Sequence, residues 1–239
     1  MEFLGLNWSS IIVFLALAVI GVWVAFSFLN KQGLYLFSVV AVLISRWLVP
    51  ANLFSRPVDI DIIIMPVVFF ALLTCLSKFG LEEAKKLFFT VIIAKVALFI
   101  CIFFAAAYFD SAAMSQVALT WEILGPFVAS AVAYALAGAL TFLTTTKKVV
   151  KNLKKFLVLA IHLAIASAIF VVTYVVFVYS GLASFGNILL IILIDLIIVC
   201  LVSLLLGYFE KFLNREVEHH DEEKEETAKE QEIEVKDID

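Results

Sequence analysis

Three ionisable side chains inside apolar stretches are the residues of this sequence best placed to do chemistry. Lys95, His162 and Asp195 lie in the segments VIIAKVALF, LVLAIHLAIAS and LLIILIDLIIVC. Moving an ionised group into an apolar medium is costly, so such a residue faces the interior of a helix bundle or a cavity. There it pairs, changes its protonation state or meets water, which is the chemistry of a substrate or proton pathway.

Each of the three also has alternatives that the sequence leaves open. Lys95 lies about 10 Å into its run, and it either joins a cavity or an ion pair or snorkels to the cytoplasmic interface. His162 either makes a hydrogen bond to a neighbouring helix or relays protons. Asp195 is too short to reach an interface, so it pairs across helices, is protonated or meets water, and Lys95 is a candidate partner.

A second group of charges brackets the outer ends of two apolar runs. Arg46 lies near the end of the second run, and Asp59 and Asp61 stand at the start of the third. They are either interfacial anchors or the lining of an outer gate or substrate vestibule.

No other pattern indicates catalysis or metal binding. Cys75, Cys101 and Cys200 are widely spaced within apolar runs and form no C-x-x-C pair. His219 and His220 stand among acids and are interpreted as solvated charge. Nucleotide-binding loops, zinc-protease and nucleophile-elbow motifs are missing from the sequence. We therefore expect a protein that is not an enzyme and uses no cofactor and no metal.

The composition determines what must hold these residues in place. Of the 239 residues, 64% are hydrophobic and 16% are charged, with a mean hydropathy of +1.10. Soluble domains have roughly 45–50% apolar and about 25% charged residues. The sequence therefore predicts an integral membrane protein and gives no indication of nucleic-acid binding.

Apolar runs close to the roughly 17–25 residues of a spanning helix occur seven times. The fold class predicted is all-α, a polytopic membrane helix bundle of about seven (six to seven) spans, because no run alternates with the period of a strand. The runs are Ile11–Leu29, Leu34–Val49, Ile60–Leu76, Phe88–Tyr108, Pro126–Leu143, Phe156–Tyr179 and Ile188–Phe209. We expect Ile11–Leu29 to be a retained span, and 110–125 to lie at the outer surface with Pro126 opening the next span.

The basic residues of the short loops predict the orientation. Alternate loops carry most of the lysines, and the loops between them carry almost none. Since basic loops face the cytoplasm, we expect an N-terminus outside and a C-terminus inside the cell membrane. The predicted cytoplasmic residues are Lys31, Lys78, Lys85, Lys86, Lys147, Lys148, Lys151, Lys154, Lys155, Lys211 and Arg215.

Two regions follow from the charge distribution. Residues 1–209 form the predicted bundle. Residues 210–239 hold 13 acidic and 5 basic residues, a net charge of −8. This acidic segment is expected to be a disordered cytoplasmic tail or a frayed, solvated helix.

Several of these residues form a pattern found in one transporter family. Met65-Pro66, Phe69, Phe79-Gly80 and Ala84-Lys85-Lys86 resemble the signature of the queuosine-precursor transporter family, also called the vitamin uptake transporter-like (VUT) family. A second match comprises Ala129-Ser130, Ala133-Tyr134 and Lys147-Lys148. The family's polar T-D pair falls on Leu72 and Leu73, and its Q-x-x-D falls on Gly138 and Thr141, so the chain resembles a divergent member.

This resemblance implies uptake of a 7-deazaguanine such as preQ0 or preQ1 by alternating access around a midplane site. Tyr134, Trp47 and Thr141 would supply stacking and hydrogen bonds to an aromatic heterocycle. The predicted substrate-binding residues are Arg46, Asp61, Lys95, Tyr134, Thr141, His162 and Asp195.

Two other functions stay open. The chain could be the substrate-binding membrane subunit of an ATP-driven vitamin-type transporter, or a scaffold whose acidic tail recruits a basic partner. The partners expected are the lipid bilayer, a small-molecule substrate and an ATPase module or further copies of the chain.

Overall fold

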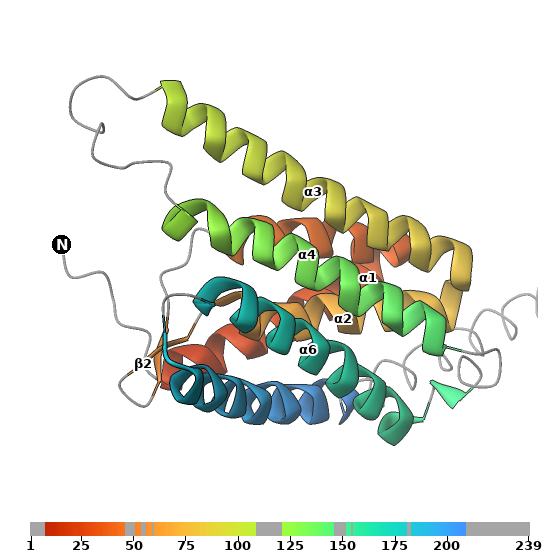
Figure 1. Ribbon diagram of the computed structural model, residues 1–239. Helices are drawn as coiled ribbons and strands as arrows, with labels where there is room; N and C mark the ends of the chain where they lie inside the picture. Colours follow the sequence, from red (N-terminus) through yellow and green to blue (C-terminus); the bar gives the residue numbers. More distant parts are fainter. Residues whose placement is uncertain are drawn as a thin grey trace, which may run out of the picture.

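The computed structural model is a bundle of long helices lying side by side (Figure 1). It describes residues 8–45, 51–53, 56–58, 60–108, 121–145, 152–153, 155–180 and 183–208. The helices are α1 (Trp8–Ser45), α2 (Ile60–Phe79), α3 (Leu81–Tyr108), α4 (Trp121–Thr144), α6 (Phe156–Tyr179) and a last helix, Phe185–Tyr208. Strands β1 (Ala51–Leu53) and β2 (Arg56–Val58) pair antiparallel in a short hairpin. The predicted helical membrane bundle is confirmed.

Four helical segments are long and apolar enough to cross a bilayer, namely Asp61–Phe79, Gly125–Thr144, Phe156–Tyr179 and Phe185–Tyr208. A shorter apolar helix, Leu29–Ser45, accompanies them. The spanning segment Gly125–Thr144 agrees with the predicted span Pro126–Leu143, but the helix itself begins earlier. Pro126 does not open the helix, because α4 begins at Trp121 and continues through the proline. A proline there removes only the bond to the carbonyl four residues earlier, which α4 tolerates close to its end.

Two of the predicted spans are the arms of α1, which turns back on itself at Asn30 (φ 53°, ψ −131°). A Cβ added to Gly33 would lie 1.7 Å from the carbonyl oxygen of Ala25, and one added to Gly21 would lie 3.2 Å from the Phe37 ring. Residues this far apart in sequence touch only if the two arms run antiparallel. Gly33 therefore permits the close approach of the two arms at the turn.

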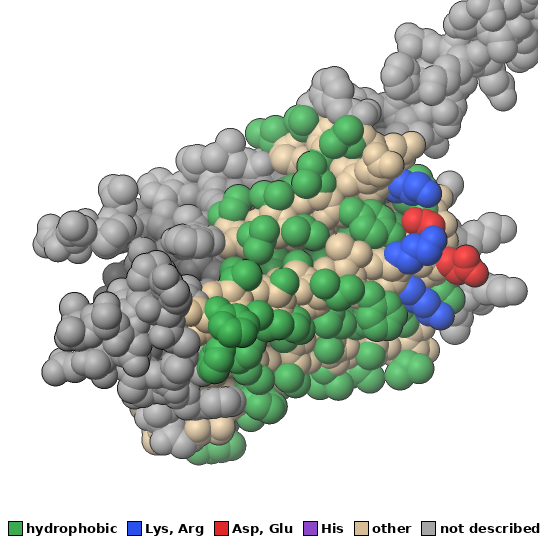
Figure 2. Space-filling model, turned by 90° about the horizontal axis from the view of Figure 1, so that it is seen from above, with side chains coloured by type: hydrophobic (Ala, Val, Ile, Leu, Met, Phe, Trp, Pro, Cys, Tyr) green, Lys and Arg blue, Asp and Glu red, His purple; other side chains and the backbone are tan. Residues whose placement is uncertain are grey.

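Helix α2 is the centre of the bundle. Every residue from Asp61 to Leu76 is buried, and 83% of its spanning segment is buried, compared with 28% for Phe185–Tyr208. It contacts α1, α3, α4 and α6. A helix that is apolar around its whole circumference belongs in such a position. The outer helices instead present leucine, isoleucine and phenylalanine to the surroundings, as lipid-facing helices do (Figure 2).

The turn between α2 and α3 is made by Gly80, whose φ of +88° is the left-handed conformation that ends many helices. Glu83 just beyond it accepts bonds from Lys86 (2.7 Å) and Tyr35, and lies 3.7 Å from Lys31. Glu82, four residues before Lys86, has the spacing that favours an ion pair on a helix. The carboxylate that Lys86 bonds is that of Glu83, which also faces α1.

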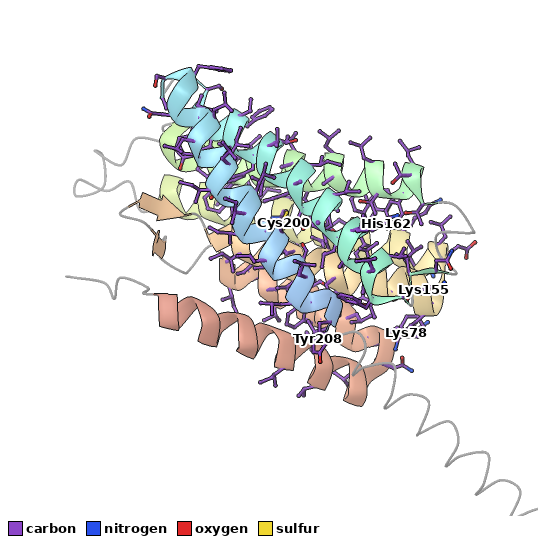
Figure 3. The ribbon with its side chains drawn as sticks, turned by 90° about the horizontal axis from the view of Figure 1, so that it is seen from below. Lys78, Lys155, His162, Cys200 and Tyr208 are labelled. Carbon is purple, nitrogen blue, oxygen red and sulfur yellow. The ribbon has the colours of Figure 1, made fainter. Side chains whose placement is uncertain are left out.

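Lysines from separate loops meet at this end of the molecule, which we call the basic end. Figure 3 shows Lys78, Lys155 and Tyr208 at the same end, and the pairing of Lys31 with Glu83 brings the turn of α1 there. The alternation of basic and non-basic loops predicted from the sequence agrees with this arrangement. The basic end comprises the described residues Lys31, Lys78, Lys85, Lys86 and Lys155.

Candidate functional site: a buried ion pair

Lys95 of α3 lies at the centre of a polar cluster inside the bundle. Its ammonium donates a 2.6 Å hydrogen bond to the Ser130 hydroxyl of α4 and lies 4.0 Å from a carboxylate oxygen of Asp61 on α2. The Asp61 residue is fully buried, and Lys95 is only 6% exposed. We call Asp61, Lys95, Ser130 and the adjoining Tyr134 the Lys95 cluster.

The geometry of α2 and α3 places this cluster far from the basic end. With a rise of about 1.5 Å per residue, Asp61 lies about 28 Å along α2 from the Gly80 turn, and Lys95 about 22 Å along α3. Of the two alternatives for Lys95, the structure shows the ion pair and not the extension to the cytoplasmic interface, because the ammonium is buried and contacts Ser130 and Asp61. Asp61, in the first turn of α2, is enclosed by protein, which among its two alternatives favours the lining of an outer vestibule.

The cluster is energetically demanding. Transferring each ion from water costs several kcal/mol, and the mutual attraction of two ions repays this only with good geometry and further hydrogen bonds. Ser130 supplies one such bond to Lys95 at 2.6 Å. The site thus holds two opposite charges that depend on each other, contributed by helices on either side of the Gly80 turn.

An aromatic stack adjoins the ion pair. The Tyr134 ring lies between the rings of Phe69 (centroids 5.2 Å apart, interplanar angle 23°) and Phe88 (5.4 Å, 27°). The Lys95 ammonium is 6.0 Å from the Tyr134 centroid, at the outer limit of a cation–π contact. The Tyr134 hydroxyl is buried and has no hydrogen-bond partner within the described part of the chain.

A small pocket opens beside the Lys95 side chain. Its volume is about 10 Å³, which is on the margin of what one water molecule needs. Sites for drug-sized ligands measure roughly 300–1,000 Å³, so this pocket cannot hold a heterocycle unless the helices part. The lining residues are Val42, Ser45, Lys95, Leu98, Phe127 and Ser130.

The other residues predicted to bind substrate lie elsewhere. The Thr141 hydroxyl bonds the Ala137 carbonyl of its own helix (2.7 Å), and His162 donates from Nδ1 to the Val158 carbonyl of its own helix (2.8 Å). The predicted interhelical bond of His162 is therefore replaced by one within α6. Asp195 is buried, 2% exposed, on the helix Phe185–Tyr208. Arg46 lies outside the described residues.

Sequence reasoning thus found three members of the cluster and missed one. Asp61, Lys95 and Tyr134 were predicted, whereas Ser130 was noticed only as part of a motif. Its position four residues before Tyr134 puts both side chains on one face of α4, and this spacing was the available signal. The stacking role of Phe69 and Phe88 has no sequence signal, since the chain contains 23 phenylalanines.

The fold and this site define a polytopic helical membrane protein with an ion pair enclosed between three of its helices. Comparison with protein-family models, curated proteins and solved structures found no match.

Proposed function

We propose that the chain is a membrane transporter for a small molecule, with the Lys95 cluster as its binding and coupling site. The observation that carries the proposal is the ion pair between Lys95 and Asp61, 4.0 Å apart and enclosed in an apolar bundle. Well-packed apolar residues would stabilise the same helices at least as well as a buried ion pair. Ionisable groups retained inside membrane segments usually belong to substrate or ion pathways.

The proposed mechanism is alternating access in which the pair opens and closes. The cluster joins α2, α3 and α4, so parting any two of these helices separates Lys95 from Asp61 or from Ser130. A separated charge needs a replacement partner, which a substrate group, or a proton taken up by Asp61, can provide. This requirement couples opening of the bundle to binding, because opening without a partner leaves a charge uncompensated.

The proposed substrate is a planar heterocycle, and the family resemblance suggests a 7-deazaguanine such as preQ0 or preQ1. Two features support it. Tyr134 stacks between Phe69 and Phe88, and a planar ring could use the same flat faces once the helices part. Asp61 can accept hydrogen bonds from the amino edge of such a ring, and Lys95 can donate to its carbonyl oxygen.

The test is uptake of labelled preQ0, preQ1 and queuine in a host lacking its own transporter. Asp61→Leu/Lys95→Met removes both charges and replaces them with apolar groups, so it should insert normally and lose uptake. Thr144→Val is the matched control on α4, because Thr144 is exposed and its hydroxyl donates to the Leu140 carbonyl of its own helix. It should insert and transport like the parent chain.

Two results would contradict the proposal. Absence of uptake of all three compounds by the correctly inserted parent chain would refute the 7-deazaguanine substrates. Full uptake by the charge-free double variant would refute the coupling role of the Lys95 cluster. Uptake that appears only when an ATPase module co-purifies would identify the ATP-driven alternative.

A further inference from the structure

The basic end carries an excess of positive charge on its exposed surface. Two acids, Glu82 and Glu83, lie among four exposed lysines, which leaves a net charge of +2, whereas the Lys78 amine is buried. The side chains of Lys31 and Lys86 are 51% and 64% exposed, and Lys85 and Lys155 are also exposed. Figure 2 shows charged side chains gathered at one end of an otherwise apolar face.

One of the two acids, Glu83, already interacts with neighbouring residues of the bundle. Glu83 bonds Lys86 and Tyr35 and lies 3.7 Å from Lys31, and its side chain is only 22% exposed. Its charge therefore compensates lysines that lie beside it and leaves Lys85 and Lys155 to face outward. An anionic partner at this end would meet ammonium groups on α1, α3 and the start of α6.

The last helix ends at the basic end, and the acidic segment follows it in the chain. A Cβ added to Gly207 would lie 2.8 Å from the Ala160 side chain and 3.2 Å from the Phe156 carbonyl oxygen. The end of this helix thus packs on the first turn of α6, directly after Lys155. From there the chain continues with residues 210–239, whose net charge is −8.

We propose that the acidic segment 210–239 binds the basic end of its own bundle through its carboxylates and the lysine ammoniums. The two surfaces have opposite charges and are joined by the same chain. Attachment to the same chain gives an effective concentration on the order of millimolar, so weak individual contacts suffice for binding. The segment would then exclude anionic lipid headgroups, which are attracted by the same lysines. This inference does not depend on transport.

The test is carbodiimide cross-linking of the purified full-length protein in neutral detergent, followed by mass spectrometry. The reagent joins a carboxylate to a lysine amine with loss of water, so it reports only pairs in contact. Mixing isotopically light and heavy protein separates links within one chain from links between chains. We expect links within one chain from segment 210–239 to Lys85, Lys86 or Lys155 at 50 mM salt, and at least fivefold fewer at 500 mM.

Two variants keep the test specific. Glu222→Gln/Glu223→Gln/Glu225→Gln/Glu226→Gln removes four negative charges from the segment and should reduce the links to the lysines by a similar factor. Lys85→Ala/Lys155→Ala should shift the remaining links to Lys31 and Lys86. Lys85 and Lys155 are exposed, and the four glutamates belong to the acidic segment, so the elution volume of the protein should not change.

Three outcomes would overturn the proposal: an absence of links, links only between light and heavy chains, or links that 500 mM salt leaves unchanged. Nanodiscs with and without 30% phosphatidylglycerol then test whether the acidic segment or anionic lipid headgroups occupy the basic end. If the links persist in both, the segment is the occupant. If anionic lipid abolishes them, lipid headgroups occupy the basic end and the proposal fails.

Discussion

Lys95 and Asp61 face each other across α2 and α3, with the ammonium 4.0 Å from the carboxylate and both side chains enclosed. The shorter contact of Lys95 is the 2.6 Å bond to Ser130. The 4.0 Å separation of the two charges is at the upper limit for a direct ion pair, and the neutral Ser130 hydroxyl holds the ammonium in place. This arrangement links three helices through one side chain.

Removing one charge of this pair should destabilise the bundle strongly. Asp61→Leu or Lys95→Met alone leaves a buried charge without its partner, at a cost of about 3–5 kcal/mol. The double variant Asp61→Leu/Lys95→Met removes both charges and should recover most of this loss. Thermal unfolding in detergent, followed by size-exclusion fluorescence, measures all three.

The same comparison tests whether the two charges stabilise each other. A double variant that is as unstable as the sum of the two single variants would show that the charges do not interact. Ser130→Ala is the intermediate case, since it removes one hydrogen bond to a charged group and should cost about 1.5–3 kcal/mol.

Phe88 and Gly138 should behave as a coupled pair. A Cβ at position 138 would lie 2.2 Å from the Phe88 ring, so Gly138→Ala forces that ring out of its place beside Tyr134. We expect a loss of about 1–3 kcal/mol from overpacking. Phe88→Leu shortens the side chain and should make the added methyl group tolerable.

The measurement is a double-mutant cycle on thermal stability. The combined variant Gly138→Ala/Phe88→Leu should be less unstable than the sum of the two changes, because they share one contact. Strict additivity would contradict the packing of Phe88 against α4.

How much of this could be predicted from the sequence differs between fold and site. The spans and the clustering of lysines at one end follow from length, hydropathy and alternation along the chain, which are local properties. The pairing of Lys95 with Asp61 is not local. It depends on α3 starting at Leu81, seven residues before the apolar run begins, which moves Lys95 about 10 Å further from the basic end.

Burial also could not be inferred for individual residues. Asp61 stands beside Asp59 at the start of an apolar run, where an interfacial position is the usual outcome. Its enclosure follows from α2 being surrounded by four helices, an arrangement that the uniform apolarity of the chain does not reveal. In the same way, the sequence does not distinguish Ser130 from the other serines, because its contact with Lys95 depends on which helix it faces.

Two glycines allow a matched test of the α1 hairpin. Gly33→Ala places a methyl group 1.7 Å from the Ala25 carbonyl oxygen, which is backbone and cannot rotate away. We expect a loss of at least about 3 kcal/mol, or failure to insert. Gly186→Ala meets nothing within 4 Å and should be neutral or stabilising by about 0.4–1 kcal/mol. Equal stability of the two variants would contradict the close approach of the arms.

The Glu83 contacts at the basic end predict a pH dependence. The hydrogen bond from Lys86 holds the pKa of the Glu83 carboxyl below its ordinary value of 4.5. A carboxyl with a lowered folded-state pKa stabilises the folded protein above pH 4.5, and this contribution is lost as the pH falls through the lowered value. The same contact raises the pKa of Lys86 above 10.5, so this contribution is present below pH 10.5 and is lost as the pH rises through the raised value.

Glu83→Gln measures this contribution directly. Its stability should fall below that of the parent chain between about pH 5 and pH 10, and the two should converge under strongly acidic conditions. Glu82→Gln is the matched control, because Glu82 is exposed and the carboxylate that contacts Lys86 is that of Glu83. A constant difference between Glu83→Gln and the parent across the acid range would contradict the prediction.

The basic end should face the cytoplasm. Lys31, Lys78, Lys86 and Lys155 lie there together, and an excess of lysine in short loops marks the inner side of a membrane. In a variant lacking Cys75, Cys101 and Cys200, Lys155→Cys should react with a membrane-impermeant maleimide only after the cells are permeabilised. Asn52→Cys, in the β1–β2 hairpin at the opposite end in Figure 1, should react in intact cells. The reverse pattern would invert the bundle and place the Lys95 cluster, which lies far from the basic end, in the half nearer the cytoplasm.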